Sequence, residues 1–307
     1  MTPATKLGVV DVLQIVDIRT KIVSVSSLLI GTAYAVYATR SFAADRFALM
    51  LLATLCVDMG TTGFNSYFDF LRGVDTADTD VEKWKALVQR GIDPAVAWRL
   101  SWLMFALAAV PGLLLGALVD WRVVPAGAAC MVVALLYSGG PSPIAGRPVG
   151  EVFAGGLLGL ALIVIAAFVQ AGTLDPRVWW LGVPSSTLIA TILSVNNACD
   201  IEGDRKAGRR TLAVVAGATR AERMIHAQMV LTLVLACALV PLDVVPASAL
   251  APLGLVAVFA WRELARMHRR GFSHATKSAC MGGISAVFAL YTVAILLGIG
   301  MGAVGLP

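Results

Sequence analysis

The chain is organised around Asn196-Asn197-Ala198-Cys199-Asp200-Ile201-Glu202-Gly203-Asp204-Arg205-Lys206, which ends an apolar run from Val178 to Val195. Acidic residues at the end of a run long enough to cross a bilayer are costly unless they have partners or a function. The i, i+4, i+8 spacing of Asn196, Asp200 and Asp204 places them within about 80° on one face of a helix. Two carboxylates and an amide oxygen on one face are typical of a hard-oxygen site that suits Mg²⁺.

Basic residues follow these acids directly. A metal site with bases beside it suggests a bound polyanion such as a diphosphate. The alternative for Asp200 and Asp204 is an ion pair at the helix end with Arg205 or Arg209. The four bases are Arg205, Lys206, Arg209 and Arg210.

A second stretch, Asn65-Ser66-Tyr67-Phe68-Asp69-Phe70-Leu71-Arg72-Gly73-Val74-Asp75, also ends an apolar run. Asn65 and Asp69 repeat the i, i+4 spacing of Asn196 and Asp200, 131 positions earlier (196 − 65). We call residues 65–75 the first motif and residues 196–204 the second motif. The alternative for Asn65 and Asp69 is a role in capping the loop that follows.

The composition indicates a polytopic membrane protein. Of the 307 residues, 58% are hydrophobic and only 14% are charged, against about 25% charged in soluble domains. We expect a single all-α domain over 1–307 with nine apolar segments, each near or above the roughly 20 residues of a spanning helix. They cover 22–39, 46–71, 95–119, 123–140, 150–171, 178–199, 221–241, 244–261 and 279–303.

Other features are weaker. The five cysteines and three histidines are scattered, which indicates neither a disulfide framework nor a zinc site. The segment Met1 to Lys21 carries charges and no cleavage site, so we expect a short interfacial amphipathic helix rather than a signal peptide.

The basic residues orient the chain. With nine spans, twenty Lys and Arg residues fall on the side of the N-terminus and the even-numbered loops, and four fall on the other: Arg40, Arg46, Arg122 and Arg177. By the positive-inside rule the N-terminus and both motifs face the cytoplasm. The longer loops there, 73–94 and 201–219, are expected to cap a site at the membrane face.

These motifs resemble the UbiA superfamily of intramembrane prenyltransferases, and most of all its 1,4-dihydroxy-2-naphthoate prenyltransferase branch. The second motif continues into Gly208-Arg209-x-Thr211-Leu212-Ala213, and Tyr137-Ser138-Gly139-Gly140-Pro141 with Gly150-Glu151 matches the same branch. The first motif departs from the wider superfamily because position 73 is glycine, and from the branch because Ser66 replaces an aspartate.

The resemblance implies nine helices around a central cavity with cytoplasmic cap loops, a Mg²⁺ cofactor and a prenyl diphosphate substrate. It implies metal binding by Asn65, Asp69, Asp200 and Asp204, and it also favours a functional Asp75. Metal ions and bases would stabilise the leaving diphosphate. The residues expected to contact substrate are Asn65, Tyr67, Arg72, Lys83, Arg147, Asn196, Asn197, Lys206 and Arg209.

Several residues keep two interpretations. Tyr137 and Tyr67 are either rings facing a carbocation or interfacial tyrosines. Arg147 is a diphosphate contact or a loop charge, and Lys83 and Lys85 likewise. Asp78, Asp80 and Glu82 are expected to be a solvated loop face.

Asp58 lies seven residues before Asn65 and about 10 Å deeper on nearly the same helix face. An ionisable group at that depth is a candidate for function. We expect it to line the acceptor pocket and to take a proton from the ring hydroxyl. The alternative is a protonated carboxyl hydrogen-bonded to Thr54, Thr61 or Thr62.

The leading prediction is an enzyme: Mg²⁺-dependent prenyl transfer to an aromatic acceptor, with decarboxylation, in menaquinone biosynthesis. A terpene cyclase with the same metal site, or transfer to another acceptor, is the alternative, and an ion-coupled transporter with a half-repeat is a third. The expected partners are the prenyl diphosphate, the acceptor and the bilayer of the inner membrane, with no nucleic acid.

Overall fold

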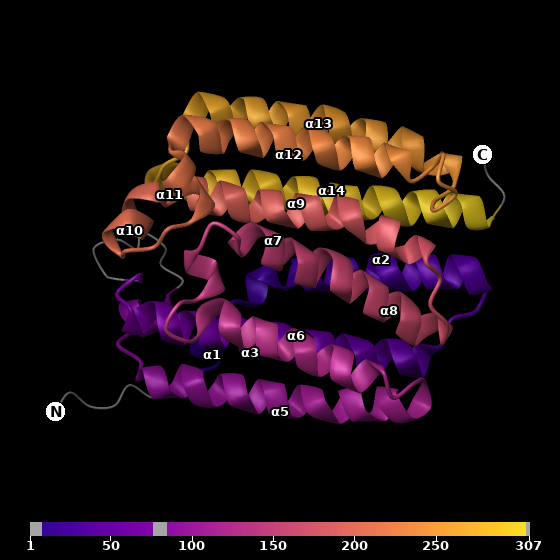
Figure 1. Cartoon of the computed structure of the whole chain (residues 1–307), viewed down its shortest axis with the longest axis horizontal. Helices are drawn as coiled ribbons and strands as arrows, with labels where there is room; N and C mark the ends of the chain where they lie inside the picture. Colours follow the sequence, from indigo (N-terminus) through magenta and orange to yellow (C-terminus); the bar gives the residue numbers. More distant parts are fainter. Residues whose placement is uncertain (1–7, 76–84, 305–307) are drawn as a thin grey trace.

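The computed structural model describes residues 8–75 and 85–304, and within these ranges every regular element is a helix. The long helices lie side by side along one direction (Figure 1). α7 continues through one π-helical segment, η3, into α8. In chain order the long elements are α2 (Ile22–Thr39), α3 (Ala44–Leu71), α5 (Pro94–Leu118), α6 (Val123–Ser138), α7 (Gly150–Ala154), η3 (Gly155–Ala161), α8 (Leu162–Ala171), α9 (Arg177–Cys199), α12 (Ala218–Ala238), α13 (Leu250–Arg270) and α14 (Lys277–Ala303).

Eight helices in the described part of the chain are long and apolar enough to cross a membrane. The remaining apolar segment, α6, has 16 residues and rises only about 24 Å, less than the roughly 30 Å of a hydrocarbon core. The predicted all-helical polytopic fold is therefore confirmed. The expected nine spans correspond to eight long helices and one short one, and the chain is a multi-pass membrane protein.

One predicted boundary is displaced. The segment expected over 244–261 is the helix α13, which runs from Leu250 to Arg270 after a short 3-10 turn, η4 (Ala247–Ala249). Pro246 precedes that turn in extended conformation, where its missing N–H costs nothing. At its other end the helix continues through Arg262, Glu263 and Arg266, because charge ends an apolar run without ending a helix.

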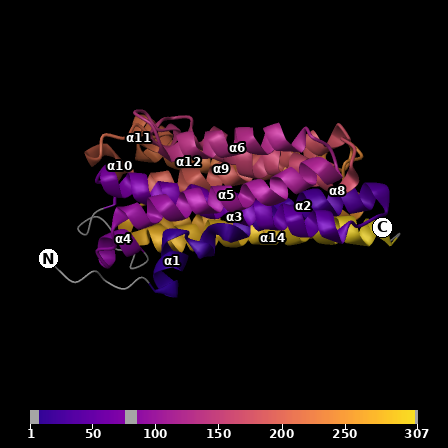
Figure 2. The ribbon, with the colours of Figure 1, turned by 90° about the horizontal axis from the view of Figure 1, so that it is seen from below.

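The cap segments from distant parts of the chain gather at one end of the bundle. Figures 1 and 2 show α10 (Ile201–Lys206) and α11 (Leu212–Ala216) at one end, and Figure 2 shows α4 (Ala86–Gln89) at the same end. α3 and α9 both terminate there, at Leu71 and Cys199. The two motifs, far apart in sequence, are therefore neighbours in space.

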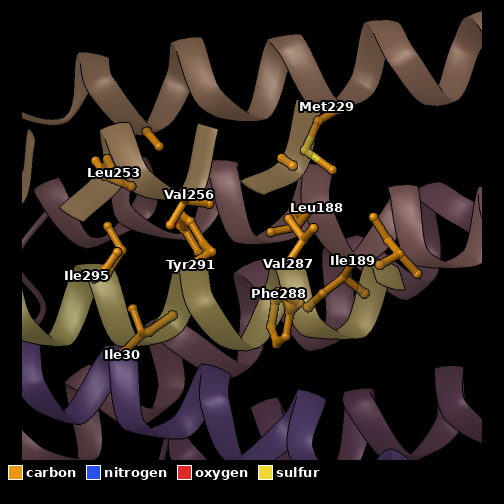
Figure 3. Packing of buried hydrophobic residues seen from close by; sticks show 14 of the residues in the cluster. Ile30, Leu188, Ile189, Met229, Leu253, Val256, Val287, Phe288, Tyr291 and Ile295 are labelled. Carbon is orange, nitrogen blue, oxygen red and sulfur yellow. The ribbon is translucent and has the colours of Figure 1, made fainter. Parts of the chain in front are cut away.

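The largest buried cluster packs α9 against α12, α13 and α14 (Figure 3). Leu188 from α9, Met229 from α12, Val256 from α13 and Val287 from α14 are each at most 3% exposed. Apolar side chains gain little by leaving hydrocarbon for another apolar surface, so close van der Waals packing holds such helices together in lipid. This cluster makes α9 and α14 a rigid support for the second motif.

Candidate active site

A cavity of about 1180 Å³ runs from the capped end into the bundle. Its polar end is lined by side chains of both motifs. Asn65, Asp69, Asn196 and Asp200 therefore surround one space. The rest of its lining is mostly apolar and comes from several helices, with α5 and α6 among them. The apolar lining includes Ala108, Ala109, Gly112, Leu113, Val124, Gly127, Ala128 and Met131. A long apolar chain with a polar head matches this division.

The first motif lies at the end of α3. Asn65 Oδ1 accepts a hydrogen bond from Ser138 Oγ at 2.9 Å. The side chain of Asp69 makes no hydrogen bond or ion pair with any residue that the structure describes, although it faces the cavity. An unpaired carboxylate in such a place is typical of a cation-binding position.

Gly73 explains why the first motif departs from the wider pattern. Its φ is +64°, in the left-handed region that a helix C-terminus favours for glycine. The turn lets the N–H groups of Val74 and Asp75 donate to Asp69 O at 2.9 and 3.3 Å. The chain thus folds back, and Asp75 reaches the cavity with its Oδ2 atom 2.8 Å from Lys85 Nζ.

The second motif is not one continuous helix. α9 ends at Cys199 and α10 begins at Ile201, with Asp200 between them at φ −108° and ψ 13°. The predicted single helical face is therefore interrupted at Asp200. Asn196, Asp200 and Asp204 nevertheless line the same cavity.

Asp204 is held by a base and a hydroxyl. Arg209 Nη1 lies 3.1 Å from Asp204 Oδ1, and Thr211 Oγ1 donates to Oδ2 at 3.2 Å. Arg209 Nη2 also donates to Ala145 O at 2.9 Å, which ties this pair to the segment after α6. Burial raises the pKa of Asp204 above its ordinary value, and the Arg209 guanidinium opposes that rise. The ion pair weighed as an alternative exists, and both partners also line the cavity.

Asp200 is paired with residues that the sequence analysis missed. Lys277 Nζ lies 2.6 Å from Asp200 Oδ2, and His274 Nδ1 lies 3.2 Å from Oδ1. Both bases come from the start of the last long helix and the turn before it, and both line the cavity. The one available signal was a lysine at the start of an apolar segment on the same side as the motifs.

Asn197 is oriented by a buried carboxyl group. Its Nδ2 donates to Glu151 Oε1 at 2.9 Å, and Glu151 is 3% exposed. A Cβ atom on Gly155 would lie 2.3 Å from Ser186 O, so glycine permits the close approach of η3 to α9 that brings this pair together. Because the Asn197 nitrogen is engaged, its amide oxygen is directed away from Glu151. Sequence reasoning recorded Glu151 only as part of a matching pattern.

Asp58 lines the cavity, and its hydrogen-bond partners differ from the threonines of the alternative interpretation. Lys21 Nζ donates to its Oδ1 at 2.6 Å, and Ser24 Oγ donates to its Oδ2 at 2.5 Å. The hydrogen bonds to Thr54, Thr61 or Thr62 side chains that the alternative interpretation required are absent among the described residues. Thr62 instead donates to backbone carbonyls. The lysine, which comes from η1 (Ile18–Lys21), gives this sheltered carboxyl group an ion-pair partner at 2.6 Å.

Four predicted substrate contacts lie away from the cavity lining. Arg72 donates to the carbonyls of Ser138 and Gly140, and so anchors the loop after α6. Tyr67 packs on Trp98, with ring centroids 5.0 Å apart. Arg147 donates to Ser142 Oγ at the surface, and Lys206 is exposed on α10. Lys83, Asp78, Asp80 and Glu82 lie outside the described residues.

The remaining predicted residues do line the cavity. Tyr137 is among them, near the polar end, together with Asn196 and Asn197. The oxygen-bearing side chains are carboxylates and amides, the donor types that hard cations prefer. No group of three or more His, Cys, Asp or Glu side chains within the described ranges is close enough to form a ready-made metal cage.

Fold and site together define a helical multi-pass membrane protein with a capped polar site at one end of an apolar chamber. The chain belongs to the UbiA prenyltransferase family, whose model matches residues 24–291.

Known proteins similar to the chain are of two kinds. A protein named 1,4-dihydroxy-2-naphthoate octaprenyltransferase from Bacillus subtilis (strain 168) is 35% identical over 171 residues, 56% of this chain and 55% of that protein. The match thus spans about half of the length of this relative. Among solved structures, the apo structure of a UbiA homolog from Aeropyrum pernix K1 superposes with a TM-score of 0.67 at 19% identity, over 92% of this chain and 97% of that one. A UbiA homolog from Archaeoglobus fulgidus bound to DMAPP and Mg²⁺ gives 0.63 at 20% identity, over 93% and 99%.

Proposed function

We propose that this protein transfers an isoprenyl group from a prenyl diphosphate to 1,4-dihydroxy-2-naphthoate, with loss of CO₂, in menaquinone biosynthesis. The observation that carries the proposal is the convergence of both motifs on the polar end of an otherwise apolar cavity. The name of the Bacillus subtilis relative supports the acceptor, and the DMAPP and Mg²⁺ of the Archaeoglobus fulgidus structure support the donor and the metal.

The donor set fits Mg²⁺. Asp69, Asp200 and Asp204 supply carboxylate oxygens, and Asn65 and Asn196 supply amide oxygens. Mg²⁺ usually binds one or two carboxylates together with substrate phosphates rather than an all-protein cage, which agrees with the lack of a preformed cluster among the described residues. When bound, Mg²⁺ would neutralise charge that develops on the diphosphate.

The protein's own groups then have separate tasks. Arg209 and Lys85 line the polar end and supply positive charge for the diphosphate oxygens. The apolar lining from α5 and α6 holds the prenyl tail and keeps water from the allylic cation. Tyr137 presents an aromatic ring beside the site, where such a face stabilises positive charge.

The reaction balances without a net proton transfer. The allylic C–O bond breaks and the diphosphate leaves with the electron pair. A new C–C bond forms to the naphthoate ring, and the carboxylate departs as CO₂, which returns its bonding pair to the ring. Asp58 would therefore act as a hydrogen-bond acceptor for a ring hydroxyl, which makes the ring more electron-rich, while Lys21 donates to the same carboxyl group.

The distribution of basic residues supports a polar end of the cavity that faces the cytoplasm, with the chain in the inner membrane. Both substrates would then reach it from the compartment in which soluble diphosphates and naphthoates are found, while the tail enters from the bilayer.

The test is turnover of purified protein with a prenyl diphosphate, Mg²⁺ and 1,4-dihydroxy-2-naphthoate, followed by mass spectrometry. We expect a prenylated, decarboxylated product that requires Mg²⁺ and is lost in Asp200→Ala. Diphosphate release without that product would mean another acceptor or a terpene cyclase. Absence of diphosphate release from folded protein, across prenyl chain lengths, would reject the enzyme and favour the transporter.

A further inference from the structure

The two oxygens of Asp200 are both occupied by bases from the C-terminal part of the chain. Lys277 Nζ is 2.6 Å from Oδ2 and His274 Nδ1 is 3.2 Å from Oδ1. The Asp200 and Lys277 side chains are only 20% and 16% exposed. A pair this sheltered is screened less than a surface pair, so a cation that needs Asp200 must compete with Lys277 for it.

Lys277 is also placed to meet a substrate. It lines the cavity with Asp204 and Arg209 at the polar end. A lysine carries its charge on a flexible four-carbon stem with three rotatable donors, so it changes partner without movement of the helix. The helix itself, α14, is anchored by buried residues such as Val287 and Phe288 (Figure 3).

Because of these contacts, a metal ion competes with Lys277 for Asp200, whereas a diphosphate attracts Lys277. A metal ion alone must separate Lys277 from Asp200. A diphosphate supplies a new anion for the displaced ammonium, so its binding lowers the cost of that separation. Two ligands that each ease the binding of the other are thermodynamically coupled, and the coupling is reciprocal.

We propose that Lys277 is a diphosphate-binding residue that exchanges Asp200 for the substrate phosphates, and that this exchange makes metal and diphosphate bind together. The inference rests on the proposed function, because it assumes that this cavity takes a diphosphate with a divalent cation. In the absence of substrate, the same lysine keeps Asp200 neutralised.

Two binding titrations on purified full-length protein test this exchange without any turnover. The first measures Mg²⁺ alone by thermal shift or calorimetry. The second measures inorganic pyrophosphate at saturating Mg²⁺. For Lys277→Met we expect Mg²⁺ alone to bind about 3- to 10-fold more tightly, and pyrophosphate about 10-fold more weakly. Lys277→Gln, which keeps a hydrogen bond to Asp200 without the charge, should change both affinities in the same directions.

Opposite changes in the Mg²⁺ and pyrophosphate affinities distinguish an exchange of partners from a structural role of Lys277. A damaged site would bind both ligands less well. Arg223→Met is the matched control. This arginine is exposed near the start of α12 and does not line the cavity, so both affinities should stay at wild-type values. Lys277→Arg keeps the charge and should retain pyrophosphate binding.

Two results would overturn the inference. Lys277→Met and Lys277→Gln proteins that bind pyrophosphate as wild type does would show that Lys277 is no phosphate contact. Weaker binding of Mg²⁺ alone in both variants would show that Lys277 does not compete for Asp200. Wild-type protein that binds no pyrophosphate with Mg²⁺ would instead reject the proposed function, and the inference with it.

Discussion

The first and second motifs are alike in sequence, but their carboxylates have different surroundings. In the first motif Asp69 has no ion pair or hydrogen bond within the part of the chain that the structure describes. In the second motif Asp200 is paired with Lys277 and Asp204 with Arg209. Asp69 of the first motif therefore offers a cation a carboxylate without an ion-pair partner among the described residues. Asp200 and Asp204 of the second motif must release bases before they can do the same.

The helices that carry the motifs differ in their deeper turns as well. Seven residues before Asn65 stands Asp58, which is paired with Lys21. Seven residues before Asn196 stands Ile189, which is buried in the core and also lines the cavity. The half-repeat thus has a polar wall on α3 and an apolar wall on α9. This difference favours recognition of the polar acceptor on the α3 side.

Asp69→Asn is expected to have the largest effect on activity. It removes the carboxylate that has no ion-pair partner among the described residues, and we expect product formation to fall by about 100-fold or more. The midpoint of thermal unfolding without ligands should stay the same or rise, because an unpaired sheltered charge is lost. Initial rates in detergent measure product formation, and thermal unfolding in detergent measures the midpoint. A lower midpoint would mean that Asp69 has a stabilising partner and would weaken the comparison.

Arg209→Met, in the second motif, should lower stability, in contrast to Asp69→Asn. The variant leaves the Asp204 side chain, which is 4% exposed, without its base. We expect the free energy of unfolding to fall by about 2–3 kcal/mol. This is at or below the lower end of the range for a broken buried ion pair, because Arg209 is partly exposed. The thermal midpoint should be lower by roughly 5 °C. The exposed neighbour Arg210→Met is the control and should unfold as wild type does. Equal midpoints for the two variants would contradict a compensated second motif.

Asp58→Asn should affect the acceptor alone. We expect its KM for the naphthoate to rise about 10-fold, the scale of one lost charged hydrogen bond, with the KM for the prenyl diphosphate unchanged. Steady-state kinetics with each substrate varied in turn provide the measurement. The double variant with Lys21→Met removes the base left without its carboxylate, and so separates instability from recognition. An unchanged acceptor KM would remove Asp58 from the site.

Glu151→Leu should weaken the second motif through Asn197. We expect pyrophosphate binding at saturating Mg²⁺ to weaken about 5-fold, since the amide loses the bond that orients it. Glu151→Gln keeps an acceptor and should bind nearly as wild type does. In an Asn197→Ala background, Glu151→Leu should have no further effect. Additive losses would show that Glu151 does not act through Asn197.

The smallest effects are expected for Lys206→Met and Arg147→Met. Sequence reasoning assigned both to the diphosphate, but the structure places both side chains at the surface and outside the cavity lining. We expect kcat/KM to stay within about twofold of wild type, as for most surface charges. A 10-fold loss in either variant would support the sequence-based assignment and would require the bases of the second motif to be reassigned.

Local patterns predicted much of the site because the spacing of residues within one short segment is enough to recognise each motif. The aspartates of both motifs and Tyr137 do line the cavity. The bases were predicted less well. Lys206 and Arg205 stand directly beside the motif in sequence, yet proximity along a helix does not decide which way a long side chain points. Lys277 lies 77 positions from Asp200 and yet is its ion-pair partner.

By itself the sequence determined the class of protein, the helical spans and the two acidic motifs, and it predicted the orientation of the spans. These follow from hydropathy, the distribution of basic residues and i, i+4 spacing, all of which are local quantities. Only the tertiary structure decided which acid has no ion-pair partner among the described residues, which bases hold the others, and how Glu151 meets Asn197. The reason is physical: charge compensation depends on distances of about 3 Å between side chains, and helices remote in sequence approach that closely only once their apolar faces and small residues have packed.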